Sequence, residues 1–153
     1  MDVISLDLVY LGVGSPAFIA TGGEAVEGVR IPIGPMVVVD EISDDNPVKA
    51  VAQAYINWYE AEYGEGSVST FGAHAWDAMK LLEQALSELI DEGADLSDTA
   101  AARAALRDRL ESMGPMVGVH GVFDYSASDH MGLDERGVVL TIIENGSFKL
   151  YSE

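Results

Sequence analysis

The chain has 153 residues and no cysteine, and its 26 acidic against 8 basic residues give a net charge of −18 at pH 7. This length suits one domain with a moderate core, and 48% apolar residues is too many for a disordered chain. The lack of cysteine excludes disulfides, thiolate metal sites and cysteine nucleophiles. A surface this negative repels phosphate groups, so nucleic acid and anionic membranes are poor partners.

The acidic residues are spread along the chain, which favours a role in solubility over a cation site. The acidic loop 40–47 lacks the alternating acidic positions and central glycine of a calcium loop, so we expect a solvated linker there. No apolar run reaches the length of a membrane span. Residues 1–7 lack the basic region and cleavage site of a signal peptide, so an export signal would have to lie on sequence not present here.

The first forty residues predict strands around one short helix. Residues 3–10 are rich in β-formers and predict a strand. Ser15-Pro16 is a helix-start signal, and the helix ends at Gly22-Gly23. Residues 27–33 predict a second strand, in which Pro32 favours a sheet edge or a strand end. The apolar run 36–40 predicts a third strand.

Three helices follow, and each has a start signal. Asn46-Pro47 opens a helix to about residue 62, Ser69 one to about residue 91, and Ser97-Asp98 one that Gly114-Pro115 ends. The second helix has apolar residues at three- and four-residue steps, which predicts its inward face. These residues are Phe71, Ala75, Ala78, Leu82, Ala85 and Leu89.

The carboxy-terminal part predicts strands again. Residues 118–123 predict a strand, 126–134 a polar loop, and 138–144 and 147–151 a hairpin around Asn145-Gly146. The order is α/β, with parallel crossovers expected in the first units and an antiparallel hairpin at the end. There are few strands for so much helix. We therefore expect part of a larger fold, or a homo-oligomer formed through exposed sheet edges.

Several local patterns resemble one family, the branched-chain amino-acid-type substrate-binding proteins of ABC importers. The turn and helix at 12–18 with the strand at 25–29 resemble one of its segments, and the aromatic helix pair over 55–78 resembles another. Residues 121–133 resemble its "G.F.YS..DH.GL" segment, and 142–150 its last strands. The match runs in order along nearly the whole chain.

The resemblance implies a type I periplasmic-binding-protein fold: two Rossmann-like, three-layer α/β/α lobes with three crossings and a ligand cleft between them. Residues 1–36 and 138–153 would belong to the carboxy-terminal lobe, and 37–137 to the amino-terminal lobe. The central strands of the latter are missing, as in an incomplete fold. The resemblance also implies a periplasmic or extracellular solute-binding component without enzymatic activity. When complete, such a protein would have an ABC permease as its partner.

The resemblance also marks five candidate ligand-binding residues. Leu11, Gly12 and Val13 form the turn after the first strand, and Leu11 stands where amino-acid binders of the family often place a glutamate. Without that glutamate, the ammonium group of an α-amino acid ligand would be buried without a partner, which costs free energy. An aromatic or aliphatic carboxylate is therefore favoured as the ligand over an ordinary α-amino acid. Phe71 stands where the family places an aromatic against its ligand, and His74 could donate a hydrogen bond. The alternatives are that Leu11 only packs and that Phe71 begins the core.

Other chemistry finds little support in the sequence. The three histidines, His74, His120 and His130, lack the spacing of a metal site. Gly12-x-Gly14 lacks the third glycine of a dinucleotide-binding fingerprint, so no cofactor is expected. No serine has a nucleophile-elbow context. The alternative function is a non-catalytic interaction or oligomerising domain without a ligand of its own.

Overall fold

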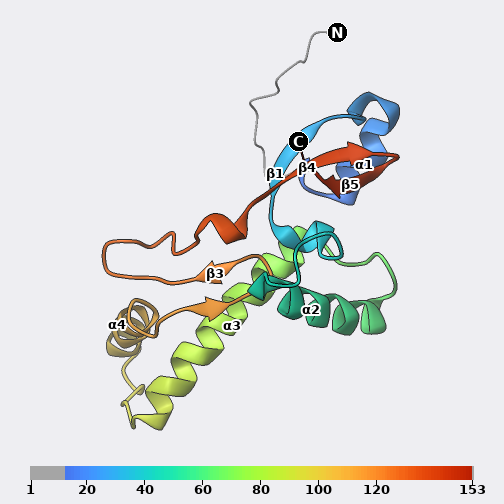
Figure 1. The fold of residues 1–153 in the computed structure, drawn as a ribbon. Helices are drawn as coiled ribbons and strands as arrows, with labels where there is room; N and C mark the ends of the chain where they lie inside the picture. The colour runs from blue at the N-terminus through green and yellow to red at the C-terminus, as the bar shows by residue number, and fades with distance from the viewer. Residues whose placement is uncertain (1–12, 153) are drawn as a thin grey trace.

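A computed structural model describes residues 13–152, and its elements form two groups (Figure 1). The sheet group consists of α1 (Pro16–Gly22), the 3-10 helix η2 (Gly23–Val26), β1 (Arg30–Ile33), β4 (Val139–Glu144) and β5 (Ser147–Leu150). The helical group consists of η3 (Pro35–Val38), α2 (Pro47–Tyr63), α3 (Thr70–Asp91), α4 (Thr99–Leu110), β2 (Met116–Val117) and β3 (Val122–Phe123). The 3-10 helix η4 (Glu135–Gly137) lies on the return path from the helical group to β4.

The sheet group is built on a three-stranded sheet in the order β1-β4-β5. Both pairings are antiparallel, with Arg30 opposite Ile142 and Ile142 opposite Lys149. Asn145 and Gly146 both have positive φ, as the predicted two-residue hairpin requires. The expected parallel crossover is wrong for β1, which joins the sheet through a strand more than 100 residues later. The predicted strand 3–10 lies outside the described residues.

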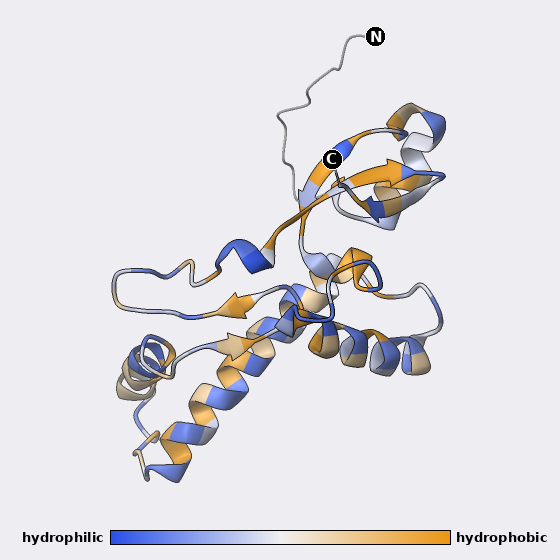
Figure 2. Cartoon of the chain, in the orientation of Figure 1, coloured by the Kyte–Doolittle hydropathy of each residue, from blue (hydrophilic) through white to orange (hydrophobic). Residues whose placement is uncertain are grey.

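Each group has its own apolar core. In the sheet group, α1, η2 and the sheet contribute the buried residues Ile19, Val26, Ile31 and Ile143. In the helical group, the buried residues come from η3, α2, α3 and the turn after β2, and they are Met36, Val39, Val48, Ala52, Tyr55, Ala73 and Val119. Figure 2 shows the hydrophobic residues of the sheet strands and of α3. Two separate cores mean that each group is stabilised largely by its own burial.

The predicted strand at 36–40 is wrong, because this run forms the 3-10 helix η3. Pro35 occupies its first turn, where the fixed φ of proline suits a helical start. Met36 and Val38 are both buried in this tight turn. An apolar run of five residues does not by itself distinguish a buried strand from a buried turn.

The three predicted long helices are confirmed, and their caps explain where they start. The side chains of Asn46, Ser69 and Asp98 each accept a backbone N–H of the first helical turn. The inward face of α3 is confirmed at Ala85 and Leu89 and differs from the prediction over the first part of the helix. Its buried residues are Thr70, Ala73, Asp77, Leu81, Ala85 and Leu89. No helix among residues 13–152 is long and apolar enough to cross a membrane.

Replacing Ile143 by alanine should destabilise the sheet group. Ile143 is 0% exposed at the centre of its core, so Ile143→Ala should lower the free energy of unfolding by about 2–5 kcal/mol, as cavities in cores do. Leu140→Ala on the same strand, where the side chain is 42% exposed, should cost about 1 kcal/mol or less. Urea unfolding of both variants measures the difference, and equal losses would contradict this packing.

Candidate functional site

The two groups meet where the turn before α1 touches the first residue of α3. The Thr70 hydroxyl Oγ1 donates a buried hydrogen bond of 3.1 Å to the carbonyl oxygen of Gly14. Gly14 comes directly before Ser15, which caps α1 by accepting the Phe18 N–H. The first turns of α1 and α3 are therefore held together across the boundary between the two cores. We call this region the junction.

The first turn of α3 presents both polar and apolar groups at the junction. Ser69 Oγ accepts the Gly72 N–H at 3.1 Å, which fixes the start of the helix. The helix amino terminus carries free N–H groups and the positive end of the helix dipole. Phe71, the next residue after Thr70, is 56% exposed. An anionic group near these N–H groups and an apolar group on Phe71 could therefore bind side by side.

Two histidine rings lie against each other, tilted, beside this turn. The His74 ring is exposed on one side and lies 4.1 Å from the His120 ring, centroid to centroid. His120 is 1% exposed, and its Nε2 lies 3.3 Å from the Thr70 carbonyl oxygen. An imidazole nitrogen beside a carbonyl oxygen must donate, so in the neutral ring Nδ1 carries a lone pair. Among the described atoms Nδ1 has no hydrogen-bond partner.

Burial keeps His120 uncharged. It lowers the pKa of this imidazole from the ordinary 6.5 to about 4, with a further contribution from His74. The ring also lies against Gly34, in the chain that crosses from β1 to η3, and a Cβ on Gly34 would overlap it. His120 thus fills the space where the crossing chain passes the start of α3.

Asp77 holds the segment that carries His120. Its carboxylate accepts the Val119 N–H at 2.7 Å and the His120 N–H at 3.0 Å. Burial raises the pKa of Asp77, whereas these two donors act in the opposite direction. The sequence predicted this role for neither residue, although His120 was considered as a metal ligand. A signal for Asp77 was available in the sequence. Asp77 stands four residues after Ala73 and four before Leu81, so an acidic side chain lies on the same face of α3 as two buried apolar ones.

The structure brings some of the five candidate residues together. Leu11 and Gly12 lie outside the described residues. Val13 adjoins Gly14 at the junction, but its half-buried side chain packs against the sheet-group core. Phe71 and His74 lie on the first turns of α3, close in sequence to the Thr70–Gly14 contact. The prediction that Phe71 could contact a ligand stays a prediction, and the alternative that it begins the core is wrong because it is exposed.

A groove of about 540 Å³ lies on another side of the junction, between α1, β5, η3 and α2. Thr70 and Gly14 line it, whereas Phe71 and His74 do not. Its rim carries the carboxylates of Asp40, Glu41, Glu60 and Glu65. The one lysine in the lining, Lys149, is already paired with Glu41. This acidic lining disfavours a carboxylate ligand in the groove itself.

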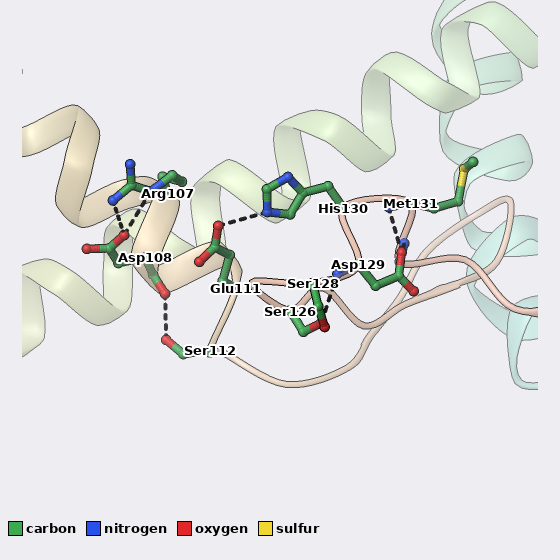
Figure 3. Close-up of polar contacts among 10 residues, drawn as sticks. Arg107, Asp108, Glu111, Ser112, Ser126, Ser128, Asp129, His130 and Met131 are labelled. Carbon is green, nitrogen blue, oxygen red and sulfur yellow. Dashed lines mark hydrogen bonds and ion pairs between the residues drawn. The ribbon is translucent and has the colours of Figure 1, made fainter.

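The polar loop around Asp129 and His130 is held by its own contacts (Figure 3). Asp129 Oδ1 accepts the N–H groups of Met131 at 2.9 Å and Gly132 at 3.2 Å. His130 Nε2 lies 2.8 Å from Glu111 Oε1, just after the end of α4. The Asp129 contacts stabilise the loop itself, and the His130 contact joins it to the end of α4. Within residues 13–152, no three histidine or acidic side chains converge in a way that could hold a metal ion.

Comparisons with known proteins find similar solved structures. No protein-family model matches the chain, and no curated protein does. An extracellular ligand-binding receptor from Rhodopseudomonas palustris HaA2 is 30% identical with a TM-score of 0.80, and the match covers 92% of this chain and 38% of the receptor. Another extracellular ligand-binding receptor from Rhodopseudomonas palustris is 29% identical with a TM-score of 0.81, covering 90% and 38%.

A third similar structure is described as a branched-chain amino acid ABC transporter from Rhodospirillum rubrum. It is 27% identical with a TM-score of 0.57, and the match covers 90% of this chain and 34% of that structure. The chain therefore spans well under half the length of these structures. It has part of their fold, which confirms the expected α/β class with its carboxy-terminal hairpin.

Stability should depend on pH through His120. Its folded-state pKa lies below the ordinary value, so the unfolded chain binds a proton first as the pH falls from 6.5 towards 4. Stability is therefore lost over this window, by about 3 kcal/mol at about 1.4 kcal/mol per pH unit. The raised pKa of Asp77 acts in the opposite direction, but it is present in wild type and variant alike.

In His120→Gln this loss should be absent, so the gap in stability between wild type and variant should shrink as the pH falls from 7 to 4. Urea unfolding at several pH values measures it. His130→Gln, at a side chain that is 66% exposed, is the matched surface control and should cost far less stability at pH 7 than His120→Gln. An unchanged slope in His120→Gln would contradict the assignment.

Proposed function

We propose that this chain supplies part of a receptor for a small solute. The proposal proceeds from its membership of the branched-chain amino-acid-type substrate-binding proteins, which have the type I periplasmic-binding-protein fold. The ligand is a carboxylate or an amino acid with an apolar body. It binds at the junction, between the first turn of α3 and the segment before Gly14, where the resemblance marks Leu11, Gly12 and Val13. The similar receptors are much longer than the part that this chain matches. Binding of the solute and docking to a transporter are activities of such a complete protein, so both belong to the proposal.

The observation that carries this proposal is the Thr70–Gly14 hydrogen bond. It ties the turn before α1 to the start of α3 and so brings two segments 56 residues apart to one place. The two cores lie on either side of it. The two cores are close to the expected division into one lobe of residues 1–36 and 138–153 and another of 37–137, except that Met36 packs in the helical group. We propose that the binding region lies where the lobes meet.

The chemistry of the first turn of α3 favours the proposed ligand class. Its free N–H groups and positive dipole end attract a carboxylate. Phe71 offers an exposed apolar ring for the ligand's body. His74 lies one turn further along and can donate a hydrogen bond. The Rhodospirillum rubrum structure, described as a branched-chain amino acid ABC transporter, supports a solute of this kind.

The place of action and the partner follow from the same relatives. Two of them are described as extracellular ligand-binding receptors, which supports a site of action outside the cytoplasmic membrane. The ABC-transporter description of the third supports a membrane permease as the partner of the complete protein. A binding role calls for no catalytic group, so the proposal includes no enzymatic activity.

Phe71→Ala should weaken ligand binding. Isothermal titration with leucine, valine, benzoate and a short-chain carboxylate identifies the ligand, and the variant should then raise its dissociation constant about tenfold or more, since burying an aromatic side chain contributes about 1.5–3 kcal/mol. Met131→Ala is the control, because this side chain is 74% exposed in the polar loop 126–134. Equal affinity of Phe71→Ala and wild type, or no binding of any probe, would contradict the proposal.

A further inference from the structure

A pocket of about 330 Å³ lies between α4 and the segment that follows β3. Its wall on α4 consists of Arg103, Leu106, Arg107 and Leu110. Steps of three, one and three residues place these four side chains on one face of the helix. No residue of α4 is fully buried, and both leucines are half-buried. Apolar surface on this face is therefore accessible to a small ligand.

The segment after β3 supplies the rest of the lining, and it is fixed at two points. The half-buried Tyr125 ring lies 6.2 Å from the ring of Phe123 in β3. His130 and Glu111 point toward one another (Figure 3), and His130 Nε2 donates to Glu111 Oε1 at 2.8 Å, just after the end of α4. We call the six residues that form the two walls the α4 pocket: Arg103, Leu106, Arg107, Leu110, Tyr125 and His130.

Arg103 is the basic residue whose charge has no partner within residues 13–152. The chain has eight lysines and arginines, and six of them form ion pairs. The seventh, Arg30, lies over the ring of Tyr151. The Arg103 guanidinium makes neither kind of contact there, although the chain has 26 acidic residues. A free guanidinium beside a pocket offers a carboxylate two parallel N–H donors.

We propose that the α4 pocket binds a small organic anion. Its carboxylate meets the Arg103 guanidinium, and its flat apolar body lies against Leu106, Leu110 and Tyr125. The volume is at the lower end of the range of about 300–1,000 Å³ for ligand pockets, which limits the occupant to a small molecule. The α4 pocket shares no residue with the junction, so this inference does not rest on the proposed function.

The charges near the α4 pocket favour an anion even though the whole chain is acidic. Three of the eight basic residues lie within seven positions of α4, at Arg103, Arg107 and Arg109. The last two are paired with acids, so Arg103 carries the uncompensated charge. Glu111, the one carboxylate in the described lining, already accepts from His130. Acids further than about 8 Å away are screened at physiological ionic strength, so the nearby guanidinium dominates.

Benzoate is the probe, because it joins a carboxylate to a flat apolar ring. An NMR titration of the 153-residue chain should shift the backbone amides of α4 and of residues 124–131. Arg103→Gln should weaken this binding about fivefold, since it removes a charge-assisted contact at an exposed side chain. Benzamide, which has the same shape without the charge, should bind wild type as weakly as benzoate binds this variant. Arg136→Gln is the matched control, with the same change of charge at an arginine outside the pocket.

Glu111→Gln adds a gain of binding, which a loss of folding cannot imitate. It removes the negative charge from the lining and should tighten benzoate binding about twofold or more. Three outcomes would overturn the inference: no shifts at α4 and residues 124–131, equal affinity of wild type and Arg103→Gln, or weaker binding by Glu111→Gln. Phe71→Ala should leave these shifts unchanged. Binding that is lost at the junction and kept at the α4 pocket, or the reverse, therefore separates this inference from the proposed function.

Discussion

The architecture depends on one buried polar contact region, in which the start of α3 is tied both to the turn before α1 and to the crossing chain. Thr70 makes two contacts here: its hydroxyl donates to Gly14, and its carbonyl accepts from His120, whose ring packs against Gly34 of the crossing chain. Asp77 holds the backbone of His120 from about two turns further along α3. Buried polar groups are costly unless paired, so these contacts fix one arrangement of the two groups at the point where their separate cores end.

This region also explains why His120 is neutral. A charged imidazole would lose its hydration in a space closed by Gly34 and the His74 ring, and the buried Asp77 uses its carboxylate on backbone N–H groups instead of forming an ion pair. The ring therefore acts as a shaped, uncharged spacer between the crossing chain and α3. Its unpartnered Nδ1 is the cost of that role.

The two faces of α3 have different consequences for function. One face is buried at Ala73, Asp77 and Leu81 and holds the junction in place. The adjoining stripe from Met79 to Ile90 is exposed. One helix therefore holds the junction in place with its buried face and presents apolar side chains on the other.

The sequence by itself determined the long helices, the closing hairpin and the family, because caps such as Asn46 and Ser69, the Asn145-Gly146 turn and the ordered motifs are local signals. It also marked Phe71 and His74 at the start of α3, whereas Leu11 and Gly12 lie outside the described residues. Only the tertiary structure decided that β1 pairs antiparallel with β4, that 35–38 is a 3-10 helix, and which face of α3 is buried. These features depend on contacts between residues far apart in the chain, and apolar spacing within one segment cannot report which neighbour it will meet.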